Sequence, residues 1–128
     1  MRTSLLIFVL GAFVPFFFVE VASDTISDSE ELGDQLADLT QKVIGETKDS
    51  GVKAQLTQTR SYLLEDVDQW KLRVERGMKS VKTYYGYVKK GTSPFIDAAS
   101  AQNKAALEKV LKGMDEVNQE VRRIRLKL

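Results

Sequence analysis

The residues that most often carry out enzyme chemistry are scarce in this chain. It contains no histidine and no cysteine, so the usual nucleophile–base pairs and zinc sites cannot be built. Asp66 and Asp68 stand two positions apart, which on a helix points them to different sides as solvated carboxylates. The segment DSEELGD (28–34) lacks the spacing of a calcium loop. We therefore expect no catalytic residue, no bound metal, no cofactor and no enzymatic activity.

Aromatic and basic residues gather in the segment SVKTYYGYVKK (80–90). On a helix Tyr84, Tyr85 and Tyr87 would point in three directions, so they cannot all enter one core. Tyrosine rings favour the boundary between apolar and wet regions, and neighbouring lysines can extend beside them. The segment therefore fits a helix end at a lipid headgroup layer or an aromatic lid on a helix bundle. We expect no nucleic-acid partner, because no recognisable nucleic-acid-binding module is present.

The first 23 residues have the layout of a secretory signal. Arg2 precedes an apolar run from Leu5 to Val19, and small or slender residues follow at 21–23. The run is shorter than the roughly 20 residues of a membrane-spanning helix. We expect residues 1–23 to be a signal peptide cleaved after Ser23, so that the protein is secreted with one mature domain, 24–128.

The mature domain has no disulfide to stabilise it, although small secreted domains usually depend on such bonds. We expect long helices, self-association or a lipid surface to supply its stability instead. Its charge is uneven, with a net charge of −7 over residues 24–68 and +8 over 69–128. These two halves should attract each other, and the basic half is also suited to anionic lipid headgroups or nucleic acid.

Almost the whole mature chain is expected to be helical, so the fold class is all-α. The expected helices span about 28–49, 52–90 and 94–128. Ser27 to Glu30 fits a capping box at the start of the first helix. Gly45 and Gly51 indicate a break or bend between the first two helices, with one continuous helix as the alternative. Gly91 is suited to cap the second helix, and Ser93 with Pro94 to begin the third. Together with a signal-peptide helix, these elements predict an antiparallel hairpin or a loose three-helix bundle.

The second expected helix carries a long apolar stripe. Several of its residues recur at intervals of 11, such as Val52, Leu63, Val74 and Tyr85, a period that keeps a stripe nearly straight. A straight stripe suits a flat lipid surface as well as a neighbouring helix. The candidate lipid-binding residues are Val52, Leu56, Leu63, Val67, Trp70, Val74, Met78, Val81, Tyr84, Tyr85 and Val88.

The third expected helix repeats differently, with apolar residues at alternating spacings of 3 and 4. This heptad favours a coiled-coil seam against another helix. The candidate seam residues are Leu107, Val110, Met114, Val117, Val121, Ile124 and Leu128.

The layout resembles the exchangeable apolipoproteins of the A/C/E superfamily, in particular their small A-II-like members. The resemblance covers about residues 58–94, where SYL opens a charged stretch and a basic segment leads to TYYGYV, then GT and a proline. It implies amphipathic helices that lie on lipoprotein or phospholipid surfaces, with the stripe from Val52 to Val88 as the binding positions. Arg60, which falls inside that stripe, departs from the family pattern.

These observations lead to two hypotheses. The first is a secreted lipid-binding and lipid-transport protein of exchangeable apolipoprotein type, a loose helical hairpin or bundle that rearranges onto lipid. The second is a secreted helical interaction protein or effector without lipid binding, with a coiled-coil homo-oligomer as one form, which the heptad favours.

Overall fold

A computed structural model describes residues 21–126, and this part of the chain confirms the all-α fold class. It contains four helices and no strand: α2 (Ser23–Glu46), α3 (Ser50–Glu75), α4 (Val81–Ala98) and α5 (Ala101–Leu126). The expected signal segment lies outside the described residues except for 21–23, and α2 begins at the last of these.

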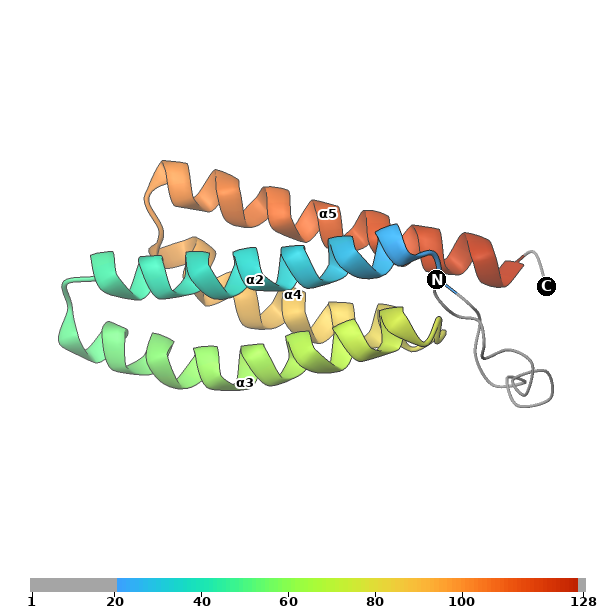
Figure 1. Cartoon of the computed structure of the whole chain (residues 1–128). Coiled ribbons are helices and arrows are strands. Elements are labelled where there is room, and N and C mark those ends of the chain that lie inside the picture. The colour runs from blue at the N-terminus through green and yellow to red at the C-terminus, as the bar shows by residue number, and fades with distance from the viewer. Residues whose placement is uncertain (1–20, 127–128) are drawn as a thin grey trace.

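The four helices form an antiparallel, up-down-up-down bundle (Figure 1). Each helix packs extensively against two others, in the cyclic order α2, α3, α4, α5, whereas contacts across the diagonals are few. The connections 47–49 and 99–100 lie together at one end, and the connection 76–80 lies at the other. The expected hairpin or three-helix bundle is therefore wrong, because the long second helix is in fact two helices.

The first helix starts earlier than expected, so the capping box at Ser27 to Glu30 is wrong. Thr25 and Ser29 are already buried, and they continue the buried stripe of α2 toward its N-terminus. The break after α2 does occur, between Gly45 and Gly51. Asp49 sets its end, because its carboxylate accepts hydrogen bonds from the N–H groups of Gly51 (2.9 Å) and Val52 (3.0 Å) and so caps α3.

The expected continuous helix over 52–90 is wrong because α3 ends at Glu75 in a Schellman motif. The N–H of Met78 donates to the carbonyl of Arg73 (2.9 Å), and the N–H of Gly77 to that of Val74 (3.0 Å). Gly77 has a φ of 61°, the left-handed conformation that favours glycine. The 11-residue stripe therefore does not run along one straight helix.

The predicted helix end at Gly91 and helix start at Ser93 and Pro94 are also wrong, because α4 continues through them to Ala98. Tertiary packing explains this. A Cβ atom at Gly91 would lie 3.2 Å from Leu63 Cδ1, so the glycine permits a close approach of α4 to α3. Phe95, seven residues or about two helical turns after Val88, is fully buried. Ending the helix at Gly91 would withdraw Phe95 from the core.

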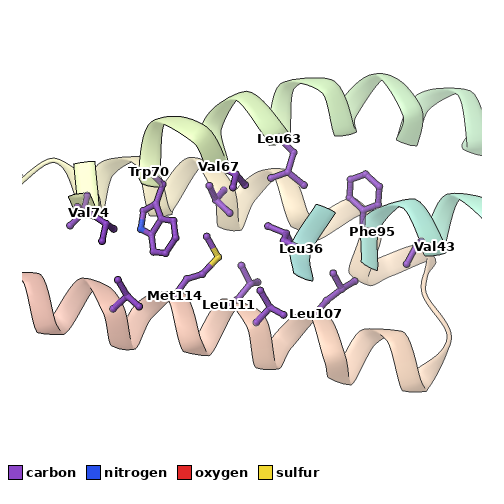
Figure 2. Packing of buried hydrophobic residues seen from close by; sticks show 14 of the residues in the cluster. Leu36, Val43, Leu63, Val67, Trp70, Val74, Phe95, Leu107, Leu111 and Met114 are labelled. Carbon is purple, nitrogen blue, oxygen red and sulfur yellow. The ribbon is translucent and has the colours of Figure 1, made fainter. Parts of the chain in front are cut away.

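All four helices contribute to one core, drawn in Figure 2. Val43, Phe95 and Leu107 lie toward the end with the connections 47–49 and 99–100, while Trp70 and Val74 lie toward the opposite end. Burying a large aliphatic or aromatic side chain contributes about 1.5–3 kcal/mol. The amphipathic helices thus cover one another's apolar faces in this structure.

The turn at Gly77 leads to a stability prediction. Gly77→Ala should lower the free energy of unfolding by about 1–2 kcal/mol, because it places a Cβ in the left-handed conformation. Gly86→Ala is the matched control, since Gly86 is helical and a Cβ there would meet nothing within 4 Å. That change should raise stability by roughly 0.5–1 kcal/mol. Urea unfolding followed by circular dichroism measures both, and equal effects would contradict the assigned turn.

Candidate functional site

Most of the sequence-predicted lipid-binding residues lie inside the bundle. Seven are buried in the core: Leu56, Leu63, Val67, Trp70, Val74, Val81 and Val88. Met78, Tyr84 and Tyr85 are half-buried, and Val52 is exposed. In the closed bundle this set is therefore not a surface that lipid can reach.

The predicted seam residues of α5 also face the core of this same chain. Leu107, Val110, Met114, Val117 and Val121 are buried, and Ile124 is half-buried. Leu128 lies outside the described residues. The heptad is thus used for packing within the chain in this structure.

The bundle divides naturally into two helix pairs. α3 and α4 pack against each other most extensively and are joined by the connection 76–80. α2 and α5 pack side by side without a direct connection. We call the boundary between α2–α5 and α3–α4 the interpair interface. Both connections that cross it, 47–49 and 99–100, lie at the same end of the bundle (Figure 1), so the pairs are joined covalently at one end only.

Polar bonds between helices concentrate at this interface. Within residues 21–126 six side-chain hydrogen bonds join residues that stand 20 or more positions apart, and five of them cross the interpair interface. Both ion pairs of the described chain, Lys71–Asp68 and Arg123–Glu120, lie within single helices. The attraction expected between the acidic and basic halves therefore produces no ion pair between helices in this part of the chain.

Arg60 joins α3 to α2. Its Nε donates to Thr40 Oγ1 (3.1 Å) and one of its terminal nitrogens to the carbonyl of Ala37 (3.0 Å). Arg60 stands between Leu56 and Leu63 in the repeat of buried positions along α3. The basic residue that interrupts the apolar stripe is thus a link between the pairs, which sequence reasoning did not reveal.

Trp70 forms the most deeply buried link. Its indole N–H donates to Asn118 Oδ1 at 2.7 Å, and no part of Trp70 is exposed. Asn118 is also buried, and its Nδ2 has no hydrogen-bond partner. This bond joins α3 to α5 across the bundle, with one amide group left unsatisfied.

The three neighbouring tyrosines take separate roles. The hydroxyl of Tyr85 donates to the carbonyl of Leu111 (3.0 Å) and so joins α4 to α5. Burial, and then the nearby charge of Asp115, raise the pKa of Tyr85, which keeps the hydroxyl protonated and able to donate. The ring of Tyr84 lies under the guanidinium of Arg73, 4.0 Å from its centroid, and meets Tyr87 edge to face.

The last link lies at the end opposite the two crossing connections. A terminal nitrogen of Arg125, on α5, donates to the carbonyl of Gly77 at 2.7 Å. Gly77 belongs to the connection between α3 and α4, so this bond also crosses the interpair interface. The one remaining bond, from Asn103 Nδ2 to Glu46 Oε1 (2.7 Å), lies within the α2–α5 pair.

Residues 21–126 hold no group of three or more His, Cys, Asp or Glu side chains that could bind a metal ion. Within the same range no helix has the length and apolar character needed to cross a membrane.

Fold and site together define an antiparallel four-helix bundle of amphipathic helices, joined covalently at one end of its interpair interface. Comparisons with protein-family models, with curated proteins and with solved structures found no significant match to this chain.

Proposed function

We propose that this protein is a secreted lipid-binding and lipid-transport protein of exchangeable apolipoprotein type, and that it binds lipid by opening at the interpair interface. The observation that carries the proposal is the position of the connections 47–49 and 99–100 at one end of that interface. With such an arrangement the α2–α5 pair can turn away from the α3–α4 pair, while each pair keeps its own packing.

The energetics favour opening on lipid over opening in water. In water, separation would expose the core and forfeit the free energy of apolar burial. On lipid, the same side chains move from the protein core to hydrocarbon, which is about as apolar as leucine. Polar bonds between the pairs, such as Trp70–Asn118 and Tyr85–Leu111, then oppose opening. Water and headgroups can replace the partners of these bonds.

The partner of the open form is a phospholipid or lipoprotein surface. The residues that would contact it are the buried positions of the sequence-predicted set, together with their counterparts on α2 and α5. Tyr84 and Tyr87 meet edge to face on α4 and Tyr87 is exposed, and aromatic rings of this kind suit the headgroup boundary.

The experiment is quenching of Trp70 fluorescence by phosphatidylcholine vesicles with brominated acyl chains. Residues 21–126 are already mostly helical and Trp70 is already buried, so neither a large gain of helix nor a blue shift is expected. Opening should instead bring Trp70 into contact with the bromine atoms and quench its emission. Flotation of the vesicles measures binding independently. Failure of the protein to float with vesicles would overturn the proposal, and flotation without quenching would overturn the opening step.

The alternative is a helical interaction protein that does not bind lipid and that forms a homo-oligomer. The observation that favours it is a surface groove of about 650 Å³ between the first half of α3 and the end of α4, bordered by the exposed side chains of Val52 and Tyr62. Sedimentation distinguishes the two. The alternative would be supported by a tight oligomer that does not bind vesicles and that dissociates when Tyr62→Ser is introduced.

A further inference from the structure

The two ends of the bundle differ strongly in charge. One end comprises the first turn of α2, the last turns of α3 and α5, the connection 76–80 and the first turn of α4 (23–26, 72–84 and 122–126). It holds seven basic and two acidic residues, a net charge of +5. We call it the basic end; its cations are Arg73, Arg76, Lys79, Lys82, Arg122, Arg123 and Arg125. The opposite end (43–53 and 95–104) holds three basic and three acidic residues.

Apolar side chains accompany this charge. Leu126 is 75% exposed, more than any other large hydrophobic residue described, and Met78 in the connection 76–80 is half-buried. Five of the seven cations are exposed, while Arg73 and Arg125 are partly buried. Exposed cations beside an exposed leucine suit an anionic headgroup layer, because the charges meet phosphates and the leucine enters the acyl boundary.

The basic end is also the end at which the helix pairs can separate, because both crossing connections lie at the other end. There the bond from Arg125 to the carbonyl of Gly77 holds α5 against the α3–α4 connection. This acceptor is a neutral carbonyl oxygen. A phosphate group offers the guanidinium a charged, bidentate partner, and such hydrogen bonds are roughly twice as strong as neutral ones.

From these observations we propose that the basic end docks on anionic phospholipid headgroups. A headgroup phosphate then replaces the carbonyl of Gly77 as the hydrogen-bond acceptor of Arg125, and this exchange starts the separation of the pairs. This inference rests on the proposed lipid binding and names its lipid class and its trigger. It makes the protein selective for anionic surfaces, although the net charge of the whole chain is only +1.

The first part of the test measures docking by flotation with vesicles of phosphatidylcholine alone or mixed with phosphatidylglycerol. Wild-type protein should bind the anionic vesicles at least about 25-fold more tightly at low salt, and high salt should reduce the difference. Lys79→Gln with Lys82→Gln should weaken anionic binding by about 25-fold, since each surface charge contributes about fivefold. The matched control, Lys53→Gln with Lys104→Gln at the opposite end, should leave binding unchanged.

The second part isolates the Arg125 bond by comparing Arg125→Gln with Arg122→Gln. Each variant removes one charge from the basic end, but only the first removes the bond to Gly77. Both should weaken anionic binding by about fivefold. Only Arg125→Gln should open faster on phosphatidylcholine, as measured by brominated-lipid quenching of Trp70, and should lose the acceleration that anionic lipid gives to wild type. Thermal unfolding by circular dichroism verifies that all variants fold.

The outcomes separate this inference from the proposed function. Equal binding of wild type to both kinds of vesicle would overturn the inference and leave lipid binding intact, whereas no binding to either would overturn both. Equal losses in the two lysine pairs would contradict docking by the basic end. Identical opening rates of the two arginine variants would contradict the trigger. Two further results would count against a lipid headgroup as the ligand. One is complete displacement of the protein from anionic vesicles by dextran sulfate of equal charge. The other is exposure of Trp70 by inorganic phosphate in the absence of lipid.

Discussion

A disulfide between positions 33 and 67 should abolish the opening of the bundle on lipid, whereas one between positions 63 and 91 should leave opening unchanged. The first bond joins α2 to α3 and so crosses the interpair interface, while the second joins α3 to α4 within a pair. A Cβ atom at Gly33 would lie 3.1 Å from Val67 Cγ1, and one at Gly91 would lie 3.6 Å from Leu63 Cβ. The latter distance is within the range of Cβ separations in disulfides.

The chain contains no cysteine of its own, so each pair of introduced cysteines can form only one disulfide within the chain. A cross-link of this loop length stabilises the folded chain against the unfolded chain by about 3–4 kcal/mol, and it physically prevents separation of α2 from α3. Oxidised Gly33→Cys/Val67→Cys should therefore give no quenching of Trp70 by brominated vesicles, and reduction with dithiothreitol should restore it.

The pair Leu63→Cys/Gly91→Cys is the matched control and also tests the plane of opening. If the bundle opened between α3 and α4, this disulfide would block binding and the first would not. Flotation of both oxidised variants with vesicles, without quenching of Trp70, would mean that the closed bundle binds lipid through its outer surface. The measurement is the extent of quenching in the oxidised and reduced forms of each variant.

Asn118→Ala should destabilise the closed bundle by about 1–3 kcal/mol, because it leaves the buried indole N–H of Trp70 without an acceptor. The double variant Trp70→Phe/Asn118→Leu should recover part of this loss, because it removes both polar groups and the unsatisfied Nδ2 as well. Urea unfolding followed by circular dichroism gives the coupling between the two positions. Strict additivity would show that the bond contributes nothing to stability.

The same bond crosses the interpair interface, so its loss should also speed lipid binding. Every 1.4 kcal/mol removed from an opening barrier raises the rate tenfold, and we expect Asn118→Ala to bind vesicles about tenfold faster than wild type. Asn103→Ala is the matched control, because Asn103 is buried and bonded to Glu46 within the α2–α5 pair. It should lower stability without accelerating binding. An equal acceleration in both variants would indicate general loosening of the bundle.

Local physical chemistry made several features of this protein predictable. The apolar residues recur at spacings of 3 and 4, which only a helix places on one face, so the all-α class followed directly. The break between the first two helices was predictable because glycines stand on both sides of a short polar segment. The buried faces of α3 and α5 coincide with most of the residues selected from their periodicity.

Tertiary packing decided what the sequence left ambiguous at two glycines. Gly77 and Gly91 both follow basic residues, and the proline after Gly91 makes it the stronger local signal for a helix end. The structure places the end at Gly77, because α4 must continue for Phe95 to fill the core and Gly91 must lie against Leu63. Neither requirement is visible within a few residues of either glycine.

The sequence by itself thus determined that the chain is helical and which face of each helix is apolar, because both depend on neighbours within one or two turns. Only the tertiary structure decided that residues 21–126 form four helices, and which residues join their pairs. Arg60, an interruption when read along the chain, meets Thr40 on another helix, and Trp70 meets Asn118 forty-eight positions away. Such partners are chosen by the way the helices pack, and no local periodicity carries that information.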